Sequence, residues 1–136
     1  MSQRRRFLQS LPAMPLLVFA GNKKPIPNLT LSQSEAKFTQ EKFGELRIYF
    51  EGSTDQIRSM TAGSLRLKPG MSPHPPHTHP EEEFLVVTEG TGEIILEGKV
   101  TKVGPGAMMY CAANKSHGIV NTGKTPLLFY FYKWQA

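Results

Sequence analysis

The chain has 136 residues, of which 39% are apolar, 16 are basic and 11 are acidic, so its formal net charge is +5. This length suits one domain with a modest core, and the composition excludes a disordered or collagen-like chain. The single cysteine, Cys111, excludes an internal disulfide. No apolar run is long enough for a membrane-spanning helix, and no basic cluster after residue 20 marks a nucleic-acid surface. We therefore expect neither stable membrane insertion nor a nucleic-acid partner.

Residues 1–20 have the layout of an export signal, because an arginine run precedes a short apolar stretch that ends in a small residue. The pair Arg4-Arg5, followed by Phe7-Leu8, resembles a bacterial twin-arginine signal. Removing the three arginines from the 16 basic residues leaves 13 against 11 acidic ones, so most of the net charge belongs to this segment. We expect a periplasmic or secreted protein. A cytoplasmic protein with a basic extension is the alternative.

Residues 21–43 are predicted to form an N-terminal arm. Pro25 and Pro27 indicate a linker at its start, and Leu31 to Phe43 has weak helical spacing. A short helical turn or an irregular segment is expected there.

Residues 44–136 read as a series of short strands separated by glycine-containing turns. Many short strands separated by glycine-containing turns are typical of an antiparallel sandwich or barrel, so the predicted fold class is all-β. The predicted strand runs are Leu46–Glu51, Ser59–Leu67, Phe84–Thr88, Glu93–Glu97, Lys99–Val103, Ala107–Cys111, Ser116–Val120 and Leu127–Trp134.

Three of the four histidines lie within six residues of one another, and the fourth is His117. If the chain is extended there, His77 and His79 project to the same side, and Glu83 has the same parity. Together with His117, they form a set that suits one divalent transition metal such as Fe, Mn, Ni, Cu or Zn, with coordination positions left open. His74, between two prolines, is expected at the rim of such a site.

These residues resemble the two sequence motifs of the cupin superfamily. The first reads Gly70, six residues, His77-Thr78-His79, three residues, Glu83, six residues and a glycine. Its first gap is one residue longer than the usual form. The resemblance implies a double-stranded β-helix, or jelly-roll barrel, with His77, His79 and Glu83 as metal ligands.

The second motif reads Gly106, five residues, Ala112-Ala113-Asn114, two residues, His117, three residues and Asn121. Ala112 and Asn114 stand where the family usually has proline and glycine, but asparagine tolerates the left-handed backbone that such a turn needs. The resemblance implies that His117 is the fourth ligand and that Asn121 holds a turn.

The resemblance also implies an apolar cup above the metal that takes a small organic substrate or ligand. Its predicted wall residues, which mostly serve as core, are Leu85, Val87, Met109, Cys111, Phe129 and Phe131. Arg47, Arg58 and Arg66 are candidates for binding an anionic substrate, with solvated surface positions as the alternative.

Fold alone does not name the reaction. A metal-dependent oxidoreductase such as a dioxygenase is expected, with Glu83 as ligand and catalytic base if partial burial brings its pKa near neutrality. A non-catalytic metal- and ligand-binding module, an isomerase or epimerase, and a metal that only stabilises the barrel are the alternatives. The aromatic run Phe129–Trp134 is apolar on both faces, so its outer face needs cover from the N-terminal arm or from a second subunit. Because small barrels of this type also expose sheet edges, we expect a homodimer.

Overall fold

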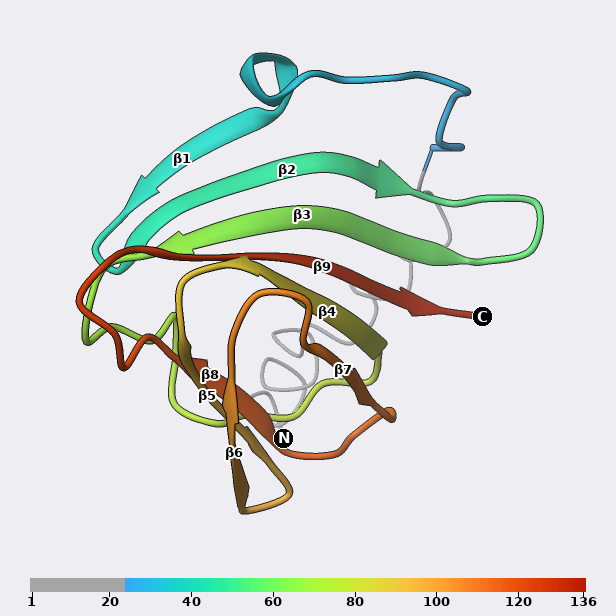
Figure 1. The fold of residues 1–136 in the computed structure, drawn as a ribbon. Coiled ribbons are helices and arrows are strands. Elements are labelled where there is room, and N and C mark those ends of the chain that lie inside the picture. Colours follow the sequence, from blue (N-terminus) through green and yellow to red (C-terminus); the bar gives the residue numbers. More distant parts are fainter. Residues whose placement is uncertain (1–23) are drawn as a thin grey trace, which may run out of the picture.

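The computed structural model describes residues 24–136 (Figure 1). The described chain contains one short 3-10 helix, Gln33–Glu35, and nine strands. The strands are β1 (Lys37–Glu41), β2 (Gly44–Gly52), β3 (Ser59–Leu67), β4 (Glu82–Glu89), β5 (Gly92–Leu96), β6 (Lys99–Val103), β7 (Met108–Cys111), β8 (His117–Val120) and β9 (Leu127–Gln135). No helix in this part of the chain is long and apolar enough to cross a membrane. The export signal predicted for residues 1–20 lies outside the described residues and stays a prediction.

The strands form two antiparallel sheets, and the all-β jelly-roll prediction is confirmed. The larger sheet has the order β1-β2-β3-β9-β4-β7, and the smaller one has the order β6-β5-β8. In Figure 1 the long strands β2, β3 and β9 curve over the top of the molecule, while β5, β6 and β8 lie below them. Strands distant in sequence are neighbours, because β9 pairs with both β3 and β4. The chain end therefore lies in the middle of the larger sheet.

The predicted N-terminal arm contains a strand, Lys37–Glu41, that the sequence pattern does not predict. Its helical part is confined to Gln33–Glu35, where Ser32 and Glu35 form a capping box. Lys37–Glu41 is extended and pairs antiparallel with β2, from Lys37 opposite Ile48 to Glu41 opposite Gly44. The expectation of a helical or irregular segment was therefore wrong for β1, which forms one edge of the larger sheet.

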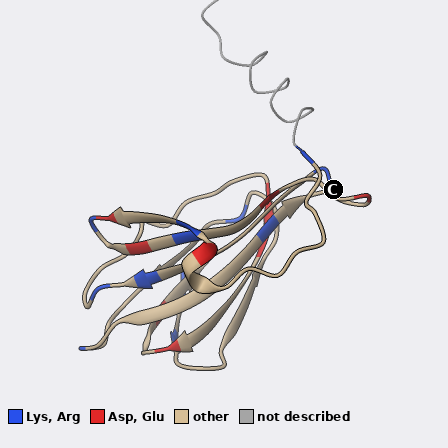
Figure 2. Cartoon of the chain, turned by 90° about the horizontal axis from the view of Figure 1, so that it is seen from above, with Lys and Arg blue, Asp and Glu red and all other residues tan. Residues whose placement is uncertain are grey.

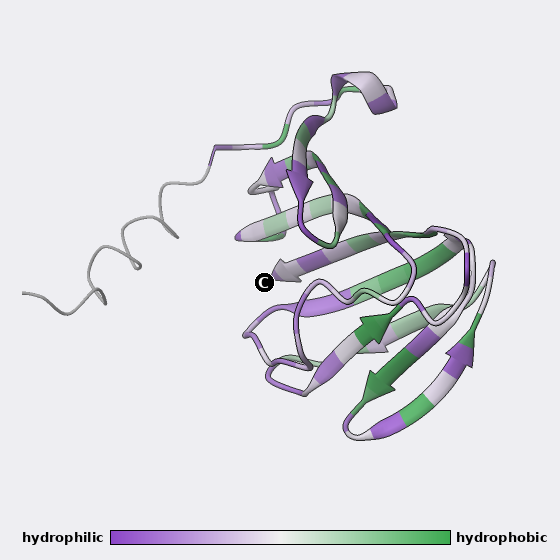
Figure 3. Cartoon of the chain, turned by 90° about the vertical axis from the view of Figure 1, so that its left-hand side faces the viewer, coloured by the Kyte–Doolittle hydropathy of each residue, from purple (hydrophilic) through white to green (hydrophobic). Residues whose placement is uncertain are grey.

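The core lies between the two sheets, because inward side chains alternate with outward ones along each strand. Figure 3 shows this alternation as changes between apolar and polar colour along the strands. The six wall residues predicted from the sequence are all buried in one cluster: Leu85, Val87, Met109, Cys111, Phe129 and Phe131. A side chain on Gly63 would lie 2.5 Å from the Arg47 carbonyl and 2.8 Å from the Phe131 ring, so glycine there lets Phe131 pack across β3.

The outer face of β4, β7 and β9 carries aromatic side chains that partly cover one another. Phe84 stacks on Trp134 with ring centroids 5.7 Å apart and meets Tyr110 at 5.3 Å. Phe84 and Tyr110 nevertheless remain 40% and 46% exposed. The homodimer expected from this face stays a prediction, and light scattering would test it by measuring the molar mass in solution.

Basic and acidic residues are interspersed over the described strands and loops (Figure 2).

Candidate metal centre

His77 and His79 lie in the loop between β3 and β4, not on a strand as the sequence reasoning assumed. This loop contains five prolines, which lack the N–H that a continuous strand ladder needs. It is tied instead to β8 by an isolated bridge, in which the His77 and His117 backbones exchange two hydrogen bonds of 3.0 Å. The Asn114 N–H also donates to the His79 carbonyl at 2.8 Å. The predicted proximity of His77 and His79 is therefore correct, although the element that carries them is a loop.

The turn before β8 helps to place His117. Asn114 has a φ of 63°, which is the left-handed conformation expected for the residue that replaces the glycine of the second motif. The turn delivers His117 to the first position of β8, where its side chain is buried.

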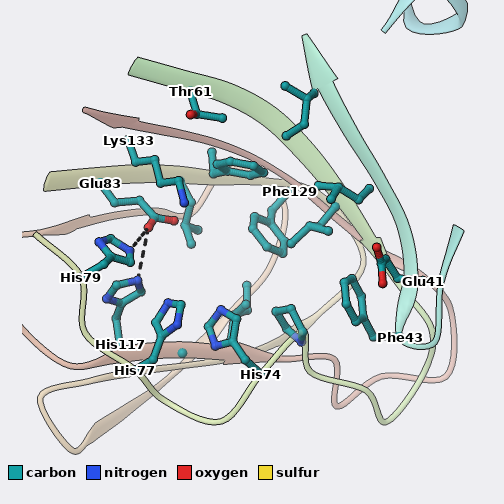
Figure 4. A pocket seen from close by; sticks show the side chains of 18 of the residues that line it. Glu41, Phe43, Thr61, His74, His77, His79, Glu83, His117, Phe129 and Lys133 are labelled. Atoms are coloured by element: carbon teal, nitrogen blue, oxygen red, sulfur yellow. Dashed lines mark hydrogen bonds and ion pairs between the residues drawn. The ribbon is translucent and has the colours of Figure 1, made fainter. Parts of the chain in front are cut away.

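The rings of His77, His79 and His117 converge in one cluster. Their centroids are 4.7 to 5.1 Å apart, and one ligand atom from each ring lies within 4.8 Å of the other two. His74 does not belong to this cluster, but its ring stacks on His77 at a centroid distance of 3.5 Å. Figure 4 shows the three rings and Glu83 pointing toward one another from the loop, from β8 and from β4.

Glu83 closes one side of the cluster from the start of β4. One of its carboxylate oxygens lies 3.0 Å from His79 Nε2 and 3.2 Å from His117 Nε2. Glu83 is buried, with 8% of its surface exposed. The structure thus brings together all four residues predicted as ligands.

Backbone carbonyls fix the tautomers of two rings. His79 Nδ1 lies 3.1 Å from the Glu81 carbonyl oxygen, and His117 Nδ1 lies 3.2 Å from the Lys115 carbonyl oxygen. A carbonyl only accepts, so each Nδ1 carries the hydrogen, and each Nε2 directs a lone pair toward the cluster unless it is protonated. Metal-ligating histidines are commonly oriented in this way.

The pKa values of two rings of the metal-free cluster are shifted in opposite directions. Burial lowers the pKa of His77 to about 4, and the charges of His74, His117 and His79 act in the same direction, against Glu83. The hydrogen bond to Glu83 raises the pKa of His117, although burial opposes it. Of these two rings, His117 therefore retains a proton to higher pH than His77.

The pKa of Glu83 differs in direction from the sequence-based expectation. Burial does raise it, but the hydrogen bonds and charges of His117 and His79 outweigh burial, and the pKa lies below its ordinary value. The carboxyl is therefore ionised at neutral pH, which suits a metal ligand better than a base tuned to pH 7.

The donor set fits a divalent transition metal. Imidazole and carboxylate ligands suit Mn, Fe, Co, Ni, Cu and Zn. The Glu83 oxygen faces two Nε2 atoms that become acceptors once their protons are lost, so a cation between them would relieve the repulsion between lone pairs. The three histidines could hold such an ion, and Glu83 lies where it would be a fourth ligand.

A cavity of about 460 Å³ opens beside the histidines. Of the predicted wall residues, Leu85, Phe129 and Phe131 line it, whereas Val87, Met109 and Cys111 do not and serve as core. The cavity size is in the range of small-molecule sites. None of the three candidate arginines lines it: Arg47 pairs with Glu45, Arg66 pairs with Glu89, and Arg58 is exposed.

Several lining residues were not singled out in the sequence as site residues, and Glu41 and Lys133 are two charged ones among them. Glu41, on the unpredicted strand β1, lies at the end of the cavity away from the histidines (Figure 4). Lys133, on β9, lies close to Glu83. The alternation along β9 could have indicated Lys133, because Leu127, Phe129 and Phe131 have the same parity.

The described chain is thus a small antiparallel jelly-roll barrel with a histidine cluster that could hold a metal ion beside a cavity. The family model described as Cupin domain matches residues 63–132. The chain belongs to the cupin family.

Solved structures agree on the fold. An RmlC-like cupin from Shewanella frigidimarina matches with a TM-score of 0.67 and 14% identity, over 82% of this chain and 94% of that one. A predicted oxalate decarboxylase from Thermotoga maritima matches with a TM-score of 0.62 and 23% identity, over 79% and 100%. The polyketide cyclase RemF from Streptomyces resistomycificus matches with a TM-score of 0.62 and 18% identity, over 81% of each chain. No curated protein matches the sequence.

Proposed function

We propose that this cupin is a metal-dependent enzyme that acts on a small organic molecule in the cavity, with a dioxygenase-type reaction as the class to test first. One divalent ion of Fe, Mn, Ni, Cu or Zn is held by His77, His79, Glu83 and His117. The observation that carries the proposal is the convergence of three ring nitrogens within 4.8 Å, two of them on rings oriented by backbone carbonyls.

The bound metal supplies Lewis acidity and, if it is redox-active, a place for oxygen chemistry. The chain supplies the rest of the site. Leu85, Phe129 and Phe131 form an apolar wall that limits the water around the substrate. Glu83 contributes a negative charge and can accept a proton only weakly, because its pKa is lowered. The described similar proteins, a decarboxylase and a cyclase, differ in reaction, so the fold supports the metal site more strongly than the reaction.

Elemental analysis of tag-free protein tests the metal site. About one equivalent of metal is expected in the wild type, and it should be lost in His77→Ala and His117→Ala, since each removes a nitrogen from the cluster. His74→Ala is the matched control, because His74 lines the cavity but lies outside the cluster. A wild-type protein that neither contains metal nor takes it up on titration would refute the proposed function.

Oxygen consumption tests the reaction class. Metal-loaded protein is incubated with a panel of phenols and enols in an oxygen electrode, with His117→Ala as the blank. Uptake that depends on His117 supports a dioxygenase. Saturable binding of a panel member without product would instead support the non-catalytic binding module, and the dioxygenase assignment would fall.

A further inference from the structure

Lys133 is a charged residue inside the cavity that the metal centre does not use. It lies on β9, opposite Thr61 of β3 on one side and Glu83 of β4 on the other. Thr61 in turn lies opposite Glu51 of β2. These four residues form a polar row across the inner face of the larger sheet, and all four line the cavity.

The next rows of the same sheet face are apolar. Phe131, two residues before Lys133 on β9, lies opposite Leu85 of β4. Phe129, two residues further back on β9, continues this apolar face. Leu65 of β3 lies opposite Phe129. The cavity therefore has a polar row next to the histidines and an apolar wall beyond it, as Figure 4 shows for Lys133, Thr61 and Phe129.

The Lys133 ammonium has no acceptor among the described residues. Glu83, its neighbour across the strands, directs its carboxylate to His79 and His117 instead. No ion pair or hydrogen bond joins Lys133 to any other side chain in residues 24–136. The side chain is half-buried, so part of its hydration is already lost. A ligand oxygen could restore a charge-assisted hydrogen bond that the protein leaves unmade.

The end of the cavity away from the histidines carries a carboxylate and, among the described residues, no lysine or arginine. Glu41, from the edge strand β1, lines the cavity together with Phe43. A carboxylate at that end repels a second negative charge on a bound molecule. Lys133 is the only lysine or arginine among the described residues that line the cavity, whereas Glu41, Glu51 and Glu83 are carboxylates. One acidic oxygen of a bound molecule therefore has a cationic side chain to bind, and a second acidic oxygen has none.

Resting on the proposed function, which puts the substrate in this cavity, we propose that Lys133 binds the acidic oxygen of a monoanionic substrate with an apolar body. An aromatic carboxylate or a phenolate has this chemistry. Its apolar part packs against Leu65, Leu85 and Phe129, and its oxygen reaches both Lys133 and the histidine cluster. A sugar phosphate or a dicarboxylate does not fit this pattern, because it lacks the apolar body or carries a second charge.

The test compares two probes of the same shape, 2-naphthoate and the neutral 2-naphthamide, by titration calorimetry on tag-free protein of known metal content. The wild type should bind the anion about tenfold more tightly than the amide, as expected for one charge-assisted hydrogen bond. Lys133→Met should abolish this preference and leave the affinity for the amide within about twofold, and Lys133→Arg should retain it. The exposed Lys99→Met serves as the matched control, and amide binding shows that each variant is folded.

The inference falls if Lys133→Met keeps the anion preference, if it loses the affinity for both probes alike, or if the wild type binds neither. Metal content separates this failure from failure of the proposed function. Protein with metal but without a Lys133-dependent preference retains the proposed function and overturns the inference. Protein without metal in which the preference depends on Lys133 retains the inference and overturns the metal-dependent function.

Discussion

The side chain of Asn121 is fully buried and uses all of its hydrogen-bonding groups within the chain. Its Nδ2 donates to the Leu67 carbonyl at 3.0 Å and to the Thr125 carbonyl at 2.8 Å, and its Oδ1 accepts from the Gly123 N–H at 2.9 Å. The end of β3 and the turn before β9 are thus held by one amide. The expectation that Asn121 holds a turn is confirmed.

Replacing Asn121 with alanine removes these three bonds and leaves buried carbonyls without donors. We expect Asn121→Ala to lower the free energy of unfolding by about 3 kcal/mol. Urea denaturation followed by fluorescence of the single tryptophan measures the change. The exposed neighbour Thr122→Ala is the control and should change the stability by less than about 0.5 kcal/mol. Equal stability of the two variants would contradict the role assigned to Asn121.

The elements differ in how well the sequence predicts them. β3, β6 and β9 match their predicted runs closely, because apolar or β-branched residues recur along them. β1 was missed because it is an edge strand whose five residues are mostly polar and none of which is buried, so no apolar alternation marks it. The structure brings the four candidate ligands together although the strand parity assumed for His77 and His79 does not apply to the loop that carries them. Their residue types and spacing, which match the cupin motifs, were sufficient to predict this proximity.

The loop that carries His77 packs directly on β8. A Cβ on Gly118 would lie 3.2 to 3.4 Å from three atoms of Pro76, the residue before His77. We expect Gly118→Val to push this loop away from β8 and to weaken metal binding about tenfold, as displacement of a ligand's support commonly does. Competition with a metallochromic chelator measures the affinity.

Gly104→Val is the control for this change, because the nearest atom to a Cβ at position 104 is 3.8 Å away. Circular dichroism checks that both variants keep their strands. An unchanged metal affinity in folded Gly118→Val would show that the loop position does not matter for the site.

At the scale of the whole molecule, the metal-free cluster makes folding stability depend on pH. The pKa of His77 is about 4 in the folded chain, against an ordinary value of 6.5. Between about pH 4 and 6.5 the unfolded chain therefore binds a proton at His77 that the folded chain does not bind, so stability falls as the pH decreases through this range. His117 acts oppositely: its raised pKa gives stability below pH 6.5 that is lost as the pH rises through the folded pKa. Glu83, with a lowered pKa, keeps its contribution above about pH 4.5.

We therefore expect the unfolding free energy of metal-free protein to fall as the pH decreases from about 6.5 to about 4 and also as it rises above about 6.5. Urea titrations after treatment with a chelator measure both slopes. His77→Gln should flatten the acid side and leave the alkaline side in place, and metal loading should reduce both. A metal-free wild type without a stability maximum near this pH would contradict the assigned shifts.

The bridge between His77 and His117 joins two points about 40 residues apart in a chain whose single cysteine is buried. A metal held by both rings would be a cross-link between the loop and the smaller sheet. By the loop-closure estimate, a permanent link across such a span stabilises a fold by about 4 kcal/mol. Unlike a disulfide, this link would be removed by a chelator and would not depend on oxidation of a cysteine. The amount of available metal would then set how stable the fold is.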